Sequence, residues 1–90
     1  MFIETLDEQL LNSDHVSKIE LVDPDEEDGM LCVIVHLSVV RATCVTVGVG
    51  DRVACTALLQ AFKDALTSHI PIFSIPDTIR YLKIDLSVPG

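Results

Sequence analysis

The residues of this chain with the clearest capacity for chemistry are the carboxylates of the segment Asp23-Pro-Asp-Glu-Glu-Asp-Gly29. Carboxylates at alternating positions resemble the start of an EF-hand calcium loop, which also requires Gly at its sixth position and Glu at its twelfth. Those two positions hold Asp28 and Ile34, and Pro24 interrupts the run. The pattern is therefore typical of a solvated hairpin loop, with an acidic patch that faces a partner as the alternative.

The acidic segment belongs to a wider charge asymmetry. Ten of the fourteen acids fall in residues 1–28, where Lys18 is the only Lys or Arg, so this part carries about −9 and the rest about +1, for a net charge of −8. Such a concentrated field favours encounter with a basic protein partner. It opposes direct binding to nucleic acid and to an anionic membrane surface. The candidate partner-binding residues are Asp23, Asp25, Glu26, Glu27 and Asp28.

Histidine and cysteine side chains could together bind zinc, and the chain offers His15, Cys32, His36 and Cys44. Cys32 and His36 share one face of a predicted strand, but four residues at ~3.3 Å each separate them by about 13 Å. Zinc ligands must converge to within ~2.0–2.3 Å of one ion. The sequence also lacks a Cys-x-x-Cys or His-x3-His pair. We therefore expect no metal site and no cofactor.

Two further motifs could support catalysis or phosphate binding. Cys55 lies near the start of a predicted helix, where the helix dipole can lower a thiol pKa, but it shares the apolar face of Phe62 and is more typical of a buried hydrophobic residue. Gly48-Val-Gly50 precedes the same helix, yet the third glycine of a phosphate-binding turn would fall on Val53, and Asp51 would repel the phosphate. We assign no catalytic residue and expect the protein not to be an enzyme.

Three segments with alternating polarity and many β-branched residues must position these side chains as strands. They are residues 17–22, 30–40 and 43–49. The predicted apolar faces consist of Ile19 and Leu21, of Leu31, Val33, Val35, Leu37 and Val39, and of Val45, Val47 and Val49. The opposite face is mixed and includes Lys18, Glu20, Cys32, Ile34, His36, Ser38, Val40, Cys44 and Thr46.

The parity of the apolar residues limits how these strands can pair, because a slip of one residue turns a strand over. A three-residue connection, Arg41-Ala42-Thr43, keeps the apolar faces together. It predicts the pairs Val39 with Val45, Leu37 with Val47, and Val35 with Val49. The same parity allows Leu21 to oppose Leu31 and Ile19 to oppose Val33, which gives an antiparallel meander.

Residues 51–69 have the pattern of an amphipathic helix. Asp51 is a good N-cap, and Pro71 ends the helix. The apolar face is formed by Cys55, Leu58, Leu59, Phe62, Ala65 and Leu66. Because the helix and the sheet each have one apolar face, we expect the helix to lie across the sheet.

The two ends of the chain are less regular. Phe2–Leu6 and Gln9–Asn12 favour a short hairpin, while Thr5-Leu-Asp-Glu8 also fits a capping box before a helical turn. Residues 70–76 are expected to be extended. Residues 79–88 alternate again and predict a strand that joins an edge of the same sheet or pairs with another copy.

Ninety residues suffice for one core, so we treat residues 1–90 as a single α+β domain. Apolar residues make up 49% of the chain, which favours a homo-oligomer in which some of them are covered. The start has no basic region typical of a signal peptide, and the longest apolar run, Met30–Val35, is too short to span a membrane. Three cysteines without a disulfide pattern favour a cytoplasmic location.

The expected fold is therefore α+β, with an antiparallel meander of four to five strands and one long helix packed on one face. The expected function is that of a non-catalytic protein-interaction or regulatory module that binds a basic partner. A narrower version is an inhibitor that mimics nucleic acid by displaying carboxylates. Two alternatives stay open: a ligand-binding or catalytic domain with a pocket at a dimer interface, including His36, Cys32 or Tyr81, and a structural subunit that docks through its apolar C-terminal third.

Overall fold

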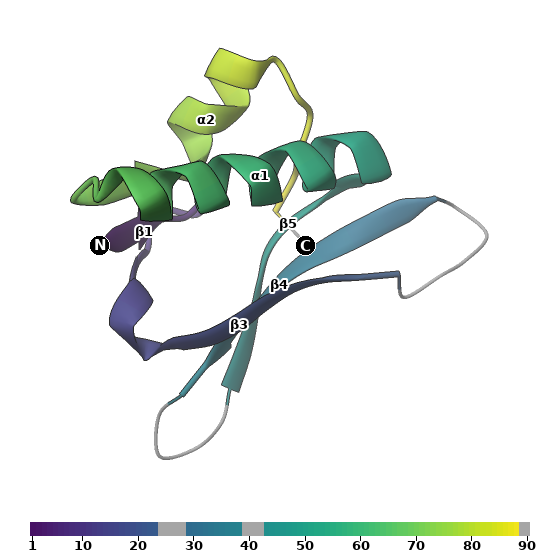
Figure 1. The fold of residues 1–90 in the computed structure, drawn as a ribbon. Coiled ribbons are helices and arrows are strands. Elements are labelled where there is room, and N and C mark those ends of the chain that lie inside the picture. Colours follow the sequence, from purple (N-terminus) through teal and green to yellow (C-terminus); the bar gives the residue numbers. More distant parts are fainter. Residues whose placement is uncertain (24–28, 39–42, 89–90) are drawn as a thin grey trace.

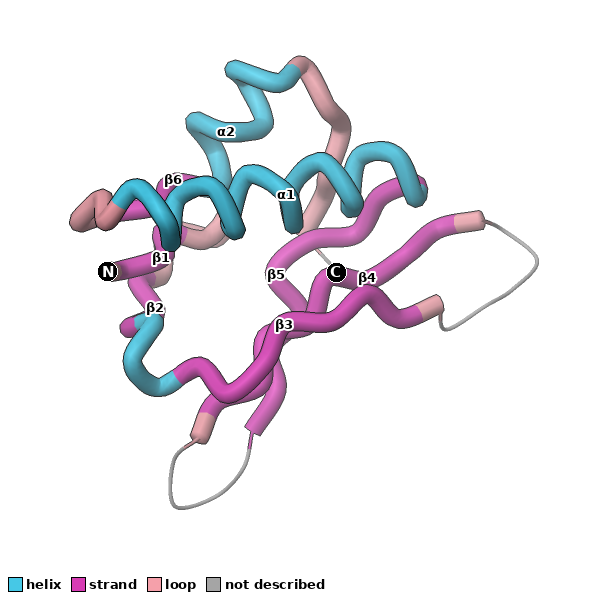
Figure 2. Tube along the Cα trace, in the orientation of Figure 1, coloured by secondary structure: helices cyan, strands magenta, loops and turns pink. Residues whose placement is uncertain are grey.

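Two three-stranded sheets and two α-helices make up the described part of the chain. The computed structural model describes residues 1–23, 29–38 and 43–88. The elements in chain order are β1 (Phe2–Glu4), β2 (Leu10–Asn12), the 3-10 turn η1 (Ser13–His15), β3 (Val16–Val22), β4 (Met30–Leu37), β5 (Thr43–Asp51), α1 (Arg52–Ser68), β6 (Ile72–Ser74) and α2 (Ile75–Leu82). The α+β class is confirmed. The strands divide into the sheets β2-β1-β6 and β3-β4-β5 instead of forming one meander (Figure 2).

The sheet β3-β4-β5 is the antiparallel meander expected from the alternating segments. The helix α1 lies across β4 and β5 on one face of this sheet (Figure 1). Leu31, Val33 and Val35 of β4 are buried beneath it, as is Val47 of β5. The predicted inner face is therefore confirmed for these residues, and burial of their branched side chains supplies the hydrophobic free energy that holds the helix to the sheet.

The predicted strand registers are wrong by an even number of residues. Ile19 pairs with Val35 instead of Val33, a shift of two. Val35 pairs with Val45 instead of Val49, a shift of four. The strand β4 ends at Leu37, so its connection to β5 is longer than the three residues assumed. An even shift keeps the same side chains on the inner face, which is why hydrophobic alternation cannot detect it.

A β-bulge in β5 also changes which residues face the core. Val33 pairs with Gly48 and Ile34 with Thr46, so Val47 is the extra residue. Beyond the bulge the alternation is reversed: Gly48 and Gly50 are buried, while Val49 pairs with Cys32 on the other face. The prediction that Val49 shares the inner face is therefore wrong.

The helix α1 begins and ends close to its predicted limits. The Asp51 carboxylate accepts a hydrogen bond from the Ala54 amide at 2.7 Å and caps the N-terminus. At the other end, His69 adopts a left-handed conformation with φ 55° before Pro71. The buried residues of the helix are Ala54, Cys55, Leu58 and Ala65, whereas Leu66, predicted on the apolar face, is 47% exposed.

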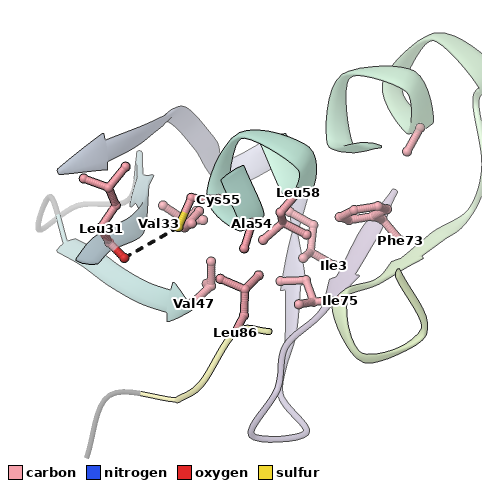
Figure 3. Close-up of a cluster of buried hydrophobic side chains, with 12 residues drawn as sticks. Ile3, Leu31, Val33, Val47, Ala54, Cys55, Leu58, Phe73, Ile75 and Leu86 are labelled. Carbon is pink, nitrogen blue, oxygen red and sulfur yellow. Dashed lines mark hydrogen bonds between the residues drawn. The ribbon is translucent and has the colours of Figure 1, made fainter. Parts of the chain in front are cut away.

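The N-terminal hairpin is confirmed, and it acquires a third strand from far along the chain. The strand β1 pairs with β2 in antiparallel fashion and with β6 in parallel, so that Ile3 lies beside both Leu11 and Phe73. Ile3 and Phe73 point into the core shared with α1 (Figure 3). The Phe73 ring meets the Phe62 ring of α1 edge-on, with centroids 5.5 Å apart, which joins the second sheet to the helix.

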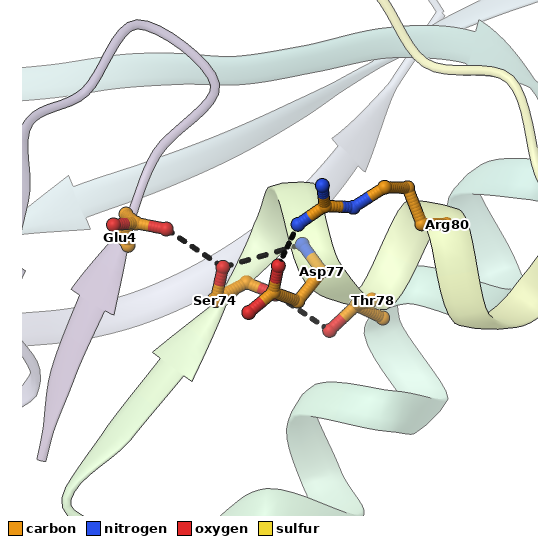
Figure 4. Close-up of polar contacts among 5 residues, drawn as sticks. All are labelled: Glu4, Ser74, Asp77, Thr78 and Arg80. Carbon is orange, nitrogen blue, oxygen red and sulfur yellow. Dashed lines mark hydrogen bonds and ion pairs between the residues drawn. The ribbon is translucent and has the colours of Figure 1, made fainter.

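Residues 75–82 form the helix α2, so the predicted strand 79–88 is wrong. Ser74 caps α2: its hydroxyl accepts from the Asp77 amide at 3.2 Å and donates to the Glu4 carboxylate of β1 at 2.7 Å (Figure 4). Pro76 occupies the first turn, where its missing N–H costs nothing. Ile75 and Ile79 then bury one helical face. These start signals outweigh the alternation that follows them.

The segment after α2 returns to the edge of β5. Ser87 and Val49 exchange two backbone hydrogen bonds of 2.9 Å each, and Leu86 enters the core beside Val47 (Figure 3). The C-terminal segment thus reaches the sheet within the same chain, but as an isolated bridge instead of a strand.

Candidate functional site

The predicted partner-binding segment joins β3 to β4. Asp23 directly follows β3 and is exposed. Asp25, Glu26, Glu27 and Asp28 lie outside the described residues. Gly29 is the first described residue after this segment. Its φ of 71° is one that glycine adopts without a steric penalty, and β4 follows. Of the five candidate residues, the structure therefore places Asp23 alone.

A second acidic turn lies in the β1–β2 hairpin and is held by a buried hydroxyl. Thr5 is 1% exposed; its Oγ1 donates to the Asp7 carboxylate and accepts from the Gln9 amide at 3.0 Å. Glu8 completes the turn in a left-handed conformation with φ 65°. Asp7 and Glu8 are exposed, so this turn presents two carboxylates on an ordered backbone.

The exposed acids of residues 1–23 form two separate groups. Asp14 stands in η1, where the Asn12 side chain accepts from its amide at 3.0 Å, close in sequence to the β1–β2 hairpin. Asp23 stands at the far end of β3, on the other side of the molecule from that hairpin (Figure 2). Seven residues of strand separate them by about 23 Å at ~3.3 Å per residue. This exceeds the ~8 Å Debye length at physiological ionic strength, so the two groups act on a partner separately.

The outer face of the sheet carries a charged cluster formed by Lys18, Glu20 and His36. His36 Nε2 lies 2.6 Å from Glu20 Oε1, and Lys18 Nζ lies 3.6 Å from Glu20 Oε2. The hydrogen bond from His36, together with the charge of Lys18, lowers the pKa of the Glu20 carboxyl below its ordinary value. The cluster fixes the direction of one carboxylate on an otherwise open strand face.

The cysteines and histidines do not assemble a metal site in the described residues, where no group of three or more potential ligands converges. Cys44 pairs with His36 across β4 and β5 and is exposed, while Cys32 lies further along β4. Cys55 is fully buried, with its Sγ 3.5 Å from the Gly50 carbonyl and 3.6 Å from the Leu31 carbonyl. Burial raises the pKa of the Cys55 thiol, which suits a core residue more than a nucleophile.

The residues of the alternative pocket hypothesis are not brought together in one chain. His36 and Cys32 lie on β4, whereas Tyr81 lies on α2 and is 86% exposed. The helix α1 runs between α2 and β4 (Figure 1). No shared site of these three side chains exists within one copy of the described chain.

Sequence reasoning missed a groove between β3 and α1. Its apolar lining consists of Val16 and Ile19 from the strand and Phe62 and Leu66 from the helix. The residues Ser13, Asp14, Ser17 and Lys18 also line it. The apolar positions of Ile19, Phe62 and Leu66 were the available signal, but which strand lies beside the helix depends on the order of strands in the sheet.

Apart from Lys18, the described Lys and Arg residues belong to the helical part of the molecule. Arg52 and Lys63 are exposed on α1, and Arg80 and Lys83 are exposed on α2 and directly after it. Four acids accompany them in the part of the chain after Gly50, so this part is nearly neutral. The field of the described residues is therefore negative around the strands and close to zero around the helices.

Comparisons with models of protein families, with curated proteins and with solved structures found no match to this chain. Among the helices of the described residues, none has both the length and the apolarity needed to cross a bilayer.

Proposed function

We propose that this protein is a small, non-catalytic interaction module that binds a basic protein partner through the acidic loop between β3 and β4. The observation that carries the proposal is the division of charge between elements. Among the described residues before β4, the exposed acids Asp7, Glu8, Asp14 and Asp23 belong to turns and ends of strands, and Lys18 is the one Lys or Arg in the described strands. A basic partner is thus attracted to the strand side of the molecule.

The loop is a better binding element than the other acidic turn because of its density of charge. It holds five acids within six residues, Asp23 to Asp28, with no base among them. The β1–β2 turn, by contrast, holds Asp7 and Glu8. Charges at the rim of an interface mainly accelerate association, so the loop should act on the rate of binding and on its dependence on salt.

Free thiols support placing the module in a reducing compartment such as the cytoplasm. Cys32, Cys44 and Cys55 are all unpaired, and Cys44 is exposed. Exposed thiols without a disulfide partner persist where glutathione and thioredoxin keep them reduced.

The test compares two variants of equal net charge. The loop variant carries Asp25→Asn, Glu26→Gln, Glu27→Gln and Asp28→Asn. The matched control carries Asp51→Asn, Asp64→Asn, Asp77→Asn and Asp85→Asn on the helix side. Each removes four of the charges that give the chain its net −8. Asn at position 51 keeps the cap of α1 because Asn and Asp cap helices about equally well.

The probe is a fluorescent dodecalysine peptide, with association followed by stopped-flow anisotropy at low and at physiological ionic strength. We expect the loop variant to slow association about tenfold at low salt and to flatten the salt dependence, because its steering charges are gone. The control should change both much less. Equal losses in the two variants would mean that binding follows net charge alone, and the proposal would be wrong.

A further inference from the structure

The edge of β3 that faces away from β4 is the longest open strand edge in the described fold. One edge of β3 pairs with β4, and no strand of the described residues pairs with its other edge. The strand is seven residues long, whereas the outer strands β2 and β6 have three residues each. The remaining outer strand, β5, meets Ser87 at Val49. An open edge of this length is a template for pairing with another strand.

The charges on this edge are complementary to themselves. Lys18 and Glu20 lie two residues apart on the outer face of β3, and their side chains are 61% and 39% exposed. In an antiparallel pair of two β3 strands centred on Ile19, Lys18 of each copy faces Glu20 of the other. Centring the pair on Lys18 would oppose two ammonium groups, and centring it on Glu20 would oppose two carboxylates. Directly opposed like charges destabilise a pair and opposite charges stabilise it, so among these three registers the charges of β3 favour the one centred on Ile19.

We propose that β3 pairs with β3 of a second copy of this chain, antiparallel and centred on Ile19, to form one continuous six-stranded sheet. The proposal goes beyond the function proposed above, since it concerns self-association and uses β3 instead of the acidic loop. Lysine on an edge strand ordinarily discourages pairing. Here the carboxylate two residues away gives that lysine a partner across the two-fold axis.

The groove beside β3 fits the same occupant. Val16 and Ile19 of β3 and Phe62 and Leu66 of α1 line it, and Leu66 is 47% exposed. In the proposed register, Ile19 meets Ile19 of the second copy, and Leu21 enters opposite Ser17. Ile19 and Leu21 both belong to the apolar face of β3. The second copy therefore places aliphatic side chains against the groove of the first and removes apolar surface from water.

The charged cluster orients the Glu20 carboxylate before a second copy binds. Because His36 holds Glu20 Oε1 at 2.6 Å, the carboxylate is already oriented along the outer face before a second copy arrives. Its other oxygen, Oε2, now faces Lys18 of its own chain at 3.6 Å. In the pair, this oxygen also receives Lys18 of the second copy, which links two charged clusters into one network across the axis.

The test measures the mass of the full chain by sedimentation over a range of concentrations. We expect the wild type to approach twice its 9.9 kDa mass. Lys18→Glu brings four carboxylates together and Glu20→Lys brings four ammonium groups together, so each should raise the dimer dissociation constant about tenfold or more. The matched reversals Arg52→Glu and Asp64→Lys, placed on α1, should leave it unchanged.

Restoring the complementarity makes the test specific to the register. An equimolar mixture of the Lys18→Glu and Glu20→Lys chains should form a heterodimer, because acids then face bases at both positions. The chain that carries both substitutions should dimerise like the wild type. Circular dichroism checks that each variant is folded.

Amide hydrogen exchange of the wild type gives a readout that needs no variant: the amides of β3 that point away from β4 should gain protection as concentration rises. A wild type that stays monomeric, a dimer that neither reversal weakens, a mixture that stays monomeric, or exchange in β3 that is independent of concentration would each overturn the proposal.

Discussion

Leu86 lies directly over Gly50, in the space where a β-carbon at position 50 would stand. Such an atom would lie 2.5 Å from Leu86 Cδ2 and 2.8 Å from the Asp85 carbonyl oxygen. Because one of these contacts is with backbone, it cannot be relieved by rotating a side chain. The C-terminal segment therefore packs on β5 only because position 50 has no side chain.

Gly50→Ala should lower the free energy of unfolding by about 1–3 kcal/mol, because the added methyl group forces the C-terminal segment away from β5. Urea denaturation measures the change. The control is Gly48→Ala, whose β-carbon would meet Leu86 at 3.8 Å, an ordinary van der Waals distance. If both substitutions had the same effect, the close approach of Leu86 to Gly50 would not be the cause.

Asp51→Ala should destabilise the protein by about 1 kcal/mol, because the Ala54 amide loses the carboxylate that caps α1. Asp51→Asn should be nearly neutral, since Asn accepts the same hydrogen bond. Thermal or urea unfolding compares the two variants. An equal loss in both would show that the charge of Asp51, and not its role as an acceptor, stabilises the helix.

Glu20 should make the stability depend on pH in the acidic range. Its pKa is lower in the folded chain than in the unfolded chain, because the folded carboxylate is hydrogen-bonded to His36 and lies near Lys18. The unfolded chain then binds the proton first, so the contribution of Glu20 is complete above the ordinary carboxyl pKa of about 4.3 and is lost as the pH falls through the lower folded value.

The measurement for Glu20 is the difference in unfolding free energy between the wild type and Glu20→Gln at a series of pH values from 7 to 3. The difference should be largest near neutrality and shrink below about pH 4.3. A difference that stays constant down to pH 3 would contradict the lowered pKa.

The three thiols should react with iodoacetamide in the order of their accessibility. Cys44 is exposed and should be alkylated first, followed by the partly buried Cys32. Cys55 is fully buried and its pKa is raised, so it should react only when the chain unfolds. Mass spectrometry of peptides after native labelling gives the order, and early modification of Cys55 would place it outside the core.

Hydrophobic alternation predicts which side of β4 is buried, but not which residues it pairs with. Val33 and Val35 face the core in every register that differs by two residues, so the pattern is blind to the observed shifts. The bulge at Val47 is equally hidden, because Val45, Val47 and Val49 alternate as regularly as an undisturbed strand would. A single extra residue then exchanges Val49 for Gly48 and Gly50 on the inner face.

The second sheet depends on contacts that local patterns do not contain. The sequence around Ile72 and Phe73 indicates an extended segment, but nothing near it indicates pairing with β1. The candidate site was predictable only in part. The acidic segment around Asp23 can be recognised from composition, whereas the open edge at Lys18 and Glu20 can be recognised only when the order of strands is known.

The parallel pairing of Glu4 with Ser74 also determines when the protein can complete its fold during synthesis. The β1–β2 hairpin leaves the ribosome before the strand that completes its sheet, Ile72–Ser74, which follows only after α1. Contacts between such distant residues form late and slow the folding of a small domain. Until then, Ile3 has no neighbour from β6 to cover it, and the nascent chain should depend on molecular chaperones more than its length suggests.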